Sequence, residues 1–509
     1  MALSTKRVIA QNTVYLYLRG IFSLFLGLYI SRVLLQTLGV NDFGLYGVVG
    51  GIVGFISFLN MAMSSASSRY ITYELAKGNL DSQKKVYTAV FVVHLCIACF
   101  TILCAETIGL WYVCSKLIIP EGRMMAAHWV YQMSILVAII NITQVPYNAL
   151  IAANEKMGFM SLWGGISDFL RLIIVISLFW ITIDRLIIYA ILIFLVNLFT
   201  AIGYRVYCKM RFPECHFVYV RDRQLFKDIL SFASFTFFTS FANVARQQGT
   251  VLLINRFFGV AVNASGNIAT MVAGNVYSFT INVVTAFRPQ IVKNYANQDI
   301  VSLQSNIILC MKYAVAMYSL IAIPIFLEMN YVLKLWLVKV PEHSVEFCKI
   351  TLLGSIIGLL NYIVIIAIQA TSRVKKNSIH ISSLGLVSIF LIYVLFRFGM
   401  SANWAFLVYT FTECAIFVVA LSNLKQVIPQ IRITNIILKL SKLVTIMFCS
   451  TVVCSLIQHL VISESFARLM IVTVLYSACF GILFYRLMLN HETRLTLKAN
   501  FLHILKIKA

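Results

Sequence analysis

The feature that most constrains this chain is a succession of apolar runs from one end of the sequence to the other. A run of about 20 apolar residues is long enough to cross the hydrocarbon core of a bilayer as an α-helix. With 61% hydrophobic and 12% charged residues, the composition is far from that of a soluble domain. We therefore expect an all-α membrane protein with about fourteen transmembrane helices. The expected spans are 13–35, 43–66, 86–108, 126–150, 159–181, 186–206, 228–254, 262–287, 307–327, 346–370, 377–397, 402–424, 436–461 and 466–488.

The basic residues between the spans predict the sidedness of the chain. Lys and Arg collect in alternate loops, for example at Lys84 and Lys85, in the stretch 211–227, and at Arg373 and Lys375. Cytoplasmic loops carry such an excess, and the number of spans is even, so we expect both termini in the cytoplasm. This distribution explains the net charge of +23 through topology and contact with anionic lipids. We do not expect nucleic acid as a partner.

A weak self-similarity at an offset of about 220 residues predicts two repeats. The matched pairs are Ile30-Ser31-Arg32 with Ile254-Asn255-Arg256, Ser68-Arg69 with Phe287-Arg288, Leu110-Trp111 with Leu335-Trp336, Pro120-Glu121 with Pro341-Glu342, and 149–156 with 367–375. Each repeat holds six spans, an even number, so the repeats enter the membrane from the same side, as in transporters that alternate access between two lobes. The expected domains are an N-lobe, 1–210 (spans 1–6), a cytoplasmic linker, 211–227, a C-lobe, 228–424 (spans 7–12), and 425–509 with spans 13–14 and a cytoplasmic tail.

Three arginines lie inside the apolar runs: Arg19, Arg171 and Arg246. An ionised side chain at bilayer depth costs about 2.5–3.5 kcal/mol on insertion scales, so it faces protein or a wet cavity. Few acidic residues accompany these arginines, which indicates an interior that receives an anion. We expect all three to bind substrate. For Arg19 an alternative is open, because it lies near the cytoplasmic end of its run and can snorkel outward.

The polar neighbours of Arg246 extend the candidate site. Asn243 lies one helical turn before Arg246, and Gln247 and Gln248 follow it directly. A polar band within a membrane span faces away from lipid. We therefore expect these residues to line the same substrate cavity as the arginines.

Two acidic residues within the spans, Asp168 and Glu413, are candidates for ion coupling or for counter-ions. Asp168 precedes Arg171 by three positions, so the two either form an ion pair that holds the bundle together or line the cavity. Glu413 lies in mid-span without a partner on its own helix. It is either protonated and structural or an ion-coupling group.

Two stretches in the N-terminal third carry a family resemblance. The residues NTVYLYLRGIFSLFLGLYISRVLLQTLGVNDFGLYGVVGGIV, Asn12 to Val53, look like the start of a Wzx-type polysaccharide repeat-unit flippase. The stretch Pro146-Tyr147-Asn148-Ala149-Leu150 through Asn154-Glu155-Lys156 is similar to the same group. Six plus six plus two spans also resemble the wider multidrug/oligosaccharidyl-lipid/polysaccharide (MATE-like) superfamily.

The resemblance implies translocation of an undecaprenyl-diphosphate-linked oligosaccharide across the bacterial inner membrane, from the cytoplasmic to the periplasmic leaflet, for capsule, O-antigen or exopolysaccharide export. Such flippases have a cationic central cavity, which is matched here by Arg19 in span 1 and Arg246 in its repeat equivalent, span 7. A guanidinium offers bidentate hydrogen bonds to a diphosphate. The implied partners are the lipid-linked oligosaccharide, membrane lipids and the polysaccharide polymerase or export machinery.

Two other classes of function remain as alternatives. A MATE-type ion-coupled multidrug antiporter shares the architecture, but it needs acidic groups in its cavity, where this chain has Arg19 and Arg246. A membrane enzyme of polysaccharide assembly, a polymerase or ligase, needs a sizeable polar outer loop, and the outer loops here are short. The sequence also lacks a phosphate-cradling glycine loop and zinc-ligand spacing. We therefore expect neither enzymatic activity nor a cofactor.

Overall fold

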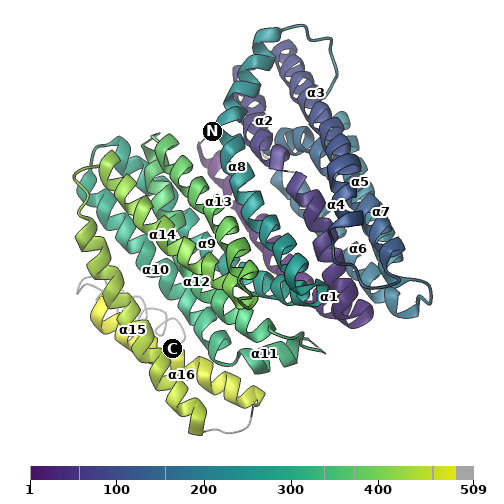
Figure 1. The fold of residues 1–509 in the computed structure, drawn as a ribbon. Coiled ribbons are helices and arrows are strands. Elements are labelled where there is room, and N and C mark those ends of the chain that lie inside the picture. Colours follow the sequence, from purple (N-terminus) through teal and green to yellow (C-terminus); the bar gives the residue numbers. More distant parts are fainter. Residues whose placement is uncertain are drawn as a thin grey trace, which may run out of the picture. The chain divides into compact units, whose positions relative to one another are not determined.

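The computed structural model describes residues 2–56, 58–154, 156–337, 339–371, 373–460 and 464–488, and every regular element among them is a helix (Figure 1). Within those residues, eleven helices are long and apolar enough to cross a membrane. They coincide with the third to sixth and the eighth to fourteenth expected spans, which confirms an all-helical, multi-pass membrane protein. The other three expected spans fall in α1, α2 and α8, which are helical but not among the eleven. The count of fourteen therefore stays a prediction.

Contacts divide the chain into two compact units, which are described separately. Unit 1 comprises Met1–Ile268, Trp336–Ser344 and Ser382–Val408, and unit 2 comprises Ala269–Leu335, Val345–Ile381 and Tyr409–Ala509. The elements up to residue 258 are α1 (Ala2–Ile56), α2 (Phe58–Lys77), α3 (Leu80–Cys104), the π-turn η1 (Ala105–Gly109), α4 (Leu110–Ser115), α5 (Met124–Ala153), α6 (Met157–Ser177), the 3-10 turn η2 (Leu178–Trp180), α7 (Arg185–Arg211) and α8 (Arg223–Phe258). The later elements are α9 (Val260–Ala296), α10 (Ile300–Leu327), α11 (Met329–Trp336), α12 (Ser344–Ala370), α13 (Lys375–Arg397), α14 (Asn403–Val427), α15 (Ile433–Leu460) and α16 (Phe466–Met488). The lobe boundaries expected from the sequence stay a prediction.

A glycine in the left-handed region divides α1 into two arms. Gly39 has a φ of 77°, a value that side chains with a Cβ rarely adopt. Gly259, with a φ of 83°, ends α8 by the same means. The separation of Gly39 and Gly259 along the chain equals the offset of the expected repeat. The repeat itself stays a prediction. The second arm of α1 then packs closely on α9, because Gly44 lies against the backbone carbonyl of Val260.

The first part of the expected linker, 211–227, is packed onto unit 1. Asn154 donates from Nδ2 to the buried Glu214 carboxylate at 2.8 Å, and the Val218 amide donates to Thr88 Oγ1 at 3.1 Å. Phe212 and Cys215 belong to the apolar core formed with α2, α3, α5 and α7. This part of the segment is therefore fixed to α3 and α5 by polar and apolar contacts.

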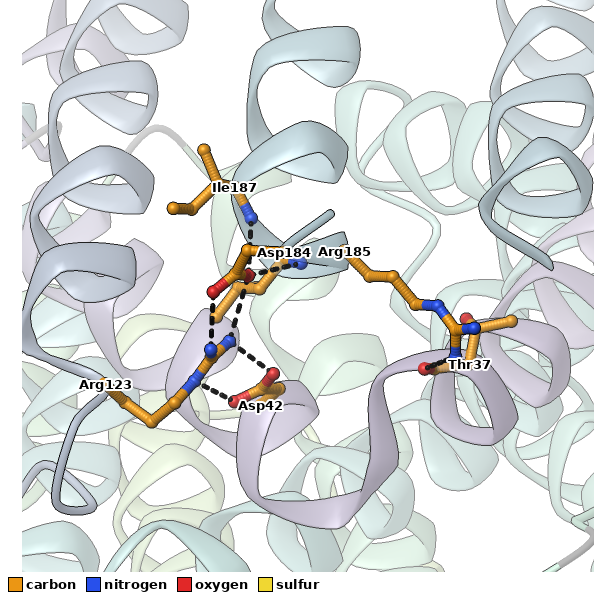
Figure 2. A network of polar contacts seen from close by, with 7 residues as sticks. Thr37, Asp42, Arg123, Asp184, Arg185 and Ile187 are labelled. Carbon is orange, nitrogen blue, oxygen red and sulfur yellow. Dashed lines mark hydrogen bonds and ion pairs between the residues drawn. The ribbon is translucent and has the colours of Figure 1, made fainter. Parts of the chain in front are cut away.

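A network around Arg123 joins three helix ends of unit 1 (Figure 2). Arg123 donates from Nε and Nη2 to Asp42 at 2.9 and 2.5 Å, and from Nη1 and Nη2 to Asp184 at 2.5 and 3.1 Å. Asp184 also caps α7 by accepting from the backbone amides of Leu186 and Ile187. One guanidinium therefore fastens α1 and the start of α5 to the start of α7.

In unit 2, α16 is tied to α10 near both of its ends. Arg468 donates from Nε and Nη2 to Glu328 Oε2 at 3.1 and 2.6 Å, and the Glu328 side chain is fully buried. Near the other end, Lys312 Nζ donates to the backbone carbonyl of Met488 at 3.3 Å. The neighbouring α15, which packs on α16 (Figure 1), contributes a hydrogen bond from Gln458 to the Leu327 carbonyl at 3.0 Å.

Candidate functional site

A cavity of about 340 Å³ lies within unit 1, between α1, α2, α5 and α7. Its lining consists of Tyr46, Gly50, Val53, Gly54, Asn60, Met133, Ser134, Val137, Ala138, Asn141, Ile142, Ala190 and Ile193. The space exists because four lining residues, Gly50, Gly54, Ala138 and Ala190, have side chains too small to fill the gap between the helices. The cavity is thus mostly apolar with a few polar groups, as in small-molecule sites.

The polar groups of this cavity are uncharged. Asn60 Oδ1 is buried and has no hydrogen-bond partner among the described residues. Among the described residues, the side chains of Ser134 and Asn141 make no hydrogen bond either. Three side chains able to donate and accept hydrogen bonds therefore face one space without protein partners.

Arg171, on α6, is not a lining residue, but it interacts with residues of two helices that line this cavity. Its half-buried guanidinium donates from Nη2 to Asn197 Oδ1 of α7 at 3.4 Å, and its buried Nε has no partner among the described residues. Asn197 follows the lining residue Ile193 by one helical turn on the same face of α7. Tyr46, which also lines the cavity, is within electrostatic range of Arg171.

Asp168 does not form the ion pair with Arg171 that was one of the two sequence interpretations. Its carboxylate accepts a hydrogen bond from Ser23 Oγ of α1 at 2.5 Å, and no ion pair joins the two side chains, both of which are described. Residues three apart on a helix differ by about 60° in direction. Asp168 consequently meets α1, whereas Arg171 meets α7.

The polar residues of α8 do not share one surface. Arg246 is half-buried beside Gly385 of α13, whose Cβ, if present, would lie 3.6 Å from Arg246 Cδ. Gln248, two residues later and about 200° around the helix, lies across Gly51 and Gly54 of α1. Asn243 and Gln247 are exposed on the side of Arg246.

Arg246 and Arg171 are each placed by contacts of their own, and no described contact joins them. For Arg19 the structure describes only the backbone, which lies in α1, so its side chain is outside the described residues. The sequence had grouped these three arginines in one site, and this grouping stays a prediction.

Glu413 lies in unit 2, buried between α12 and α14. Asn361 of α12 donates from Nδ2 to the Glu413 carboxylate at 2.7 Å and to its backbone carbonyl at 3.0 Å. Gly358, one turn before Asn361, lies beside the carboxylate, where a Cβ would be in ordinary contact with Glu413 Oε2 at 3.5 Å. Glu413 thus has its partner on a neighbouring helix.

Sequence reasoning overlooked Arg205, which lies one residue before the end of the expected span 186–206. Within α7, Arg205 donates from Nη2 to Thr143 Oγ1 of α5 at 2.7 Å, and its guanidinium lies over the Tyr147 ring at 5.7 Å. Its Nε is buried without a partner in the described part of the chain. The signal available in the sequence was the polar stripe of α5 that includes Thr143, Gln144 and Asn148.

Residues 9–295 match the model of a protein family described as polysaccharide biosynthesis protein. The chain belongs to this family. The expected resemblance to the polysaccharide flippases is thereby confirmed at the level of family. No curated protein sequence matches the chain.

Solved structures similar to this polysaccharide biosynthesis protein include the lipid II flippase MurJ in an inward closed conformation, with a TM-score of 0.68 and 13% identity over 94% of this chain and 99% of MurJ. An inward-facing multidrug resistance MATE transporter of the MOP superfamily has a TM-score of 0.60 and 14% identity over 81% of this chain and 96% of its own. A MOP superfamily transporter from Pyrococcus furiosus, described as having a binding pocket of reverse polarity, has a TM-score of 0.51 and 13% identity over 82% and 93%. These likenesses show a shared fold.

Proposed function

We propose that this chain flips undecaprenyl-diphosphate-linked oligosaccharide repeat units from the cytoplasmic to the periplasmic leaflet of the bacterial inner membrane. The observation that carries the proposal is Arg171, a half-buried guanidinium in an apolar helix that is hydrogen-bonded to a neutral amide rather than to a carboxylate. A cation at that depth with no ion-pair partner among the described residues attracts an anion. A lipid-linked diphosphate is an anion that is delivered within the bilayer, and membership of the polysaccharide biosynthesis family supports this choice.

The transport cycle that we propose is alternating access between two lobes, 1–210 and 228–424, with both termini in the cytoplasm. Arg171 binds the diphosphate, and Arg19 and Arg246 complete the cationic path. Asn243 and Gln247 lie on the side of Arg246 and assist it, while Gln248 acts indirectly by packing on α1.

Glu413 is the residue that we assign to ion coupling. Glu413 is buried, and its carboxylate accepts a hydrogen bond from the neutral side-chain amide of Asn361. An acidic side chain inside a membrane span suits a group that binds a proton or a sodium ion during transport. Asp168 is assigned the role of a counter-ion near Arg171, held in place by Ser23. Both roles rest on the flippase proposal.

The test is complementation of a deletion strain with the wild type, Arg171→Ala, or Arg211→Ala as a matched control at the exposed end of α7. We expect the deletion to abolish surface polysaccharide and to accumulate the lipid-linked unit. Wild type and Arg211→Ala should restore export, and Arg171→Ala should reduce it at least tenfold while reaching the membrane in normal amount.

Normal export by Arg171→Ala would remove this residue from the site. Unchanged polysaccharide in the deletion strain, together with a new sensitivity to cationic drugs, would favour the MATE-type antiporter instead. Loss of polysaccharide with the lipid-linked unit accumulated in the periplasmic rather than the cytoplasmic leaflet would favour an enzyme that consumes it, a polymerase or ligase.

A further inference from the structure

We infer that the cavity of unit 1 is a neutral subsite that takes one sugar ring of the lipid-linked substrate, next to a diphosphate at Arg171. This inference rests on the proposed function and deepens it. The diphosphate explains the arginines, but it does not explain a nearby uncharged cavity with three hydrogen-bonding side chains in a mostly apolar lining.

The chemistry of the lining favours a hydroxyl-rich, uncharged group. None of the lining residues carries a charge, and three of them, Asn60, Ser134 and Asn141, offer hydrogen-bonding groups without protein partners in the described part of the chain. A sugar hydroxyl both donates and accepts, so it matches amide and hydroxyl side chains alike. A lipid tail would leave the buried Asn60 carbonyl unsatisfied, which is unfavourable.

The charges around the cavity argue against two other occupants, a cationic drug and the diphosphate itself. A cationic drug would find no carboxylate in the lining, and it would lie close to the positive charge of Arg171. The diphosphate itself would find no cation among the lining residues. A neutral group attached to an anion fits, because the neutral part matches the uncharged lining and the anion matches Arg171.

The position of Arg171 fits the covalent order of the substrate. Arg171 donates to Asn197, which lies four residues, about 6 Å, beyond Ile193 along α7. In a lipid-linked oligosaccharide the first sugar is bonded directly to the diphosphate. A phosphate held at Arg171 therefore places that first ring within reach of the cavity.

The volume limits how much of the oligosaccharide enters. At about 340 Å³ the cavity is near the lower end of small-molecule sites, which span about 300–1,000 Å³. It therefore takes a single ring rather than a complete repeat unit. Further sugars would extend away from this subsite, so its selectivity concerns only the sugar next to the diphosphate.

The test measures binding by the full-length protein in lipid nanodiscs with two probes. One is the lipid-linked repeat unit extracted from the deletion strain, and the other is undecaprenyl diphosphate without sugar. Asn141→Ala removes a polar group, Ala138→Leu fills the cavity, and Leu136→Ala is a control on the exposed side of the same helix.

For the wild type and Leu136→Ala we expect the sugar-bearing probe to bind about tenfold more tightly than the sugarless one. Asn141→Ala and Ala138→Leu should reduce this ratio to about one. They should leave the affinity for undecaprenyl diphosphate unchanged, which also reports that they are folded. Arg171→Ala should weaken the binding of both probes.

A ratio that stays at the wild-type value in both cavity variants would overturn the sugar subsite while leaving the flippase proposal intact. If Ala138→Leu does not fold, Asn141→Ala alone decides, because its side chain is exposed at the cavity mouth. Failure of the wild type to bind either probe, or the absence of an accumulated lipid-linked unit, would instead overturn the proposed function.

Discussion

The side-chain amide of Asn361 donates to the carboxylate of Glu413 at 2.7 Å and to its backbone carbonyl at 3.0 Å, which links α12 to α14 inside unit 2. Both side chains are buried. One donor to this buried carboxylate is therefore an uncharged amide on a neighbouring helix. This relationship separates the charge of Glu413 from its structural role, so the two can be tested with different substitutions.

Glu413→Gln keeps the shape of the side chain and an oxygen that accepts from Asn361, but it removes the charge. We expect its thermal unfolding midpoint to stay close to that of the wild type, while transport in membrane vesicles no longer responds to an imposed ion gradient. Glu346→Gln, at the exposed start of α12, is the matched control and should keep that response. A Glu413→Gln protein with a normal gradient response would exclude Glu413 from coupling.

Glu413→Ala should be less stable than Glu413→Gln. It leaves the buried amide of Asn361 without its side-chain acceptor, which costs about 1–3 kcal/mol. Thermal unfolding in detergent, followed by intrinsic fluorescence, measures the difference. Equal midpoints for the two variants would mean that this hydrogen bond contributes little to stability.

The Arg123 network predicts an acid-sensitive contribution to the stability of unit 1. Burial favours a higher pKa for Asp184, but the hydrogen bonds from Arg123 and from the Ile187 amide outweigh it and hold the pKa below the usual value. An aspartate with a lowered pKa stabilises the folded state above its unfolded pKa of about 3.9. That stabilisation is lost as the pH falls through the folded value. Burial raises the pKa of Asp42, and Arg123 offsets only part of this effect. The ionised form of Asp42 therefore reduces stability, opposite to the contribution of Asp184.

Asp184→Asn isolates the charge, because asparagine also caps a helix. We expect it to lose about 1–2 kcal/mol of stability at pH 7, a modest amount because the ion pair is partly exposed. The loss should shrink as the pH falls from the unfolded pKa of about 3.9 through the lowered pKa of the folded state. Asp184→Ala removes the cap as well and should be less stable both at pH 7 and at low pH. A pH-independent difference between wild type and Asp184→Asn would contradict this account.

The buried ion pair of α16 should respond to single and double substitution in different ways. Arg468→Met leaves Glu328 buried and unpaired, a change that costs about 3–5 kcal/mol. The double variant Glu328→Met with Arg468→Met should recover most of that loss, because two apolar side chains need no partner. Lys334→Met, which breaks the exposed pair with Glu464, is the control and should cost at most about 1 kcal/mol. A double variant no more stable than Arg468→Met would contradict the prediction.

Gly44 and Gly27 provide a matched test of close packing within α1. A Cβ at Gly44 would overlap the backbone carbonyl of Val260, whereas nothing lies within 4 Å of a Cβ at Gly27. Gly44→Ala should therefore lower the unfolding midpoint. Gly27→Ala should leave it unchanged or raise it, because alanine is favoured over glycine in a helix by about 1 kcal/mol. Equal effects at the two positions would mean that α1 and α9 can separate without loss.

The positions of most helices could be predicted from the sequence, because a membrane span is recognised from one continuous run of apolar residues. An apolar run such as 466–488 reads as one span without any knowledge of its neighbours, and α16 occupies the same residues. The division of α1 by Gly39 was visible only as a glycine-containing turn. A second helix after this turn was expected as the span 43–66, but its close approach to α9 at Gly44 joins segments far apart in the sequence, which a local pattern does not contain.

The candidate site was accessible only in part, because its partnerships join different helices. The sequence placed Arg171 next to Asp168, since residues three apart are neighbours on one helix, but their partners are Asn197 and Ser23 on α7 and α1. Residue type identified the arginine as unusual. It could not identify the neutral amide that binds it, because asparagine in an apolar run has many possible partners.

The two fastenings of α16 have a mechanical consequence. Lys312 and Glu328 are separated by about 24 Å along α10, close to the thickness of the hydrocarbon core, and they bind opposite ends of α16. A slide of one helix past the other by a single turn would pull one of these charged groups into the apolar layer and strip it of its partner. The register between α10 and α16 is therefore fixed. If α10 moves during a transport cycle, α16 would move with it as part of the same rigid body.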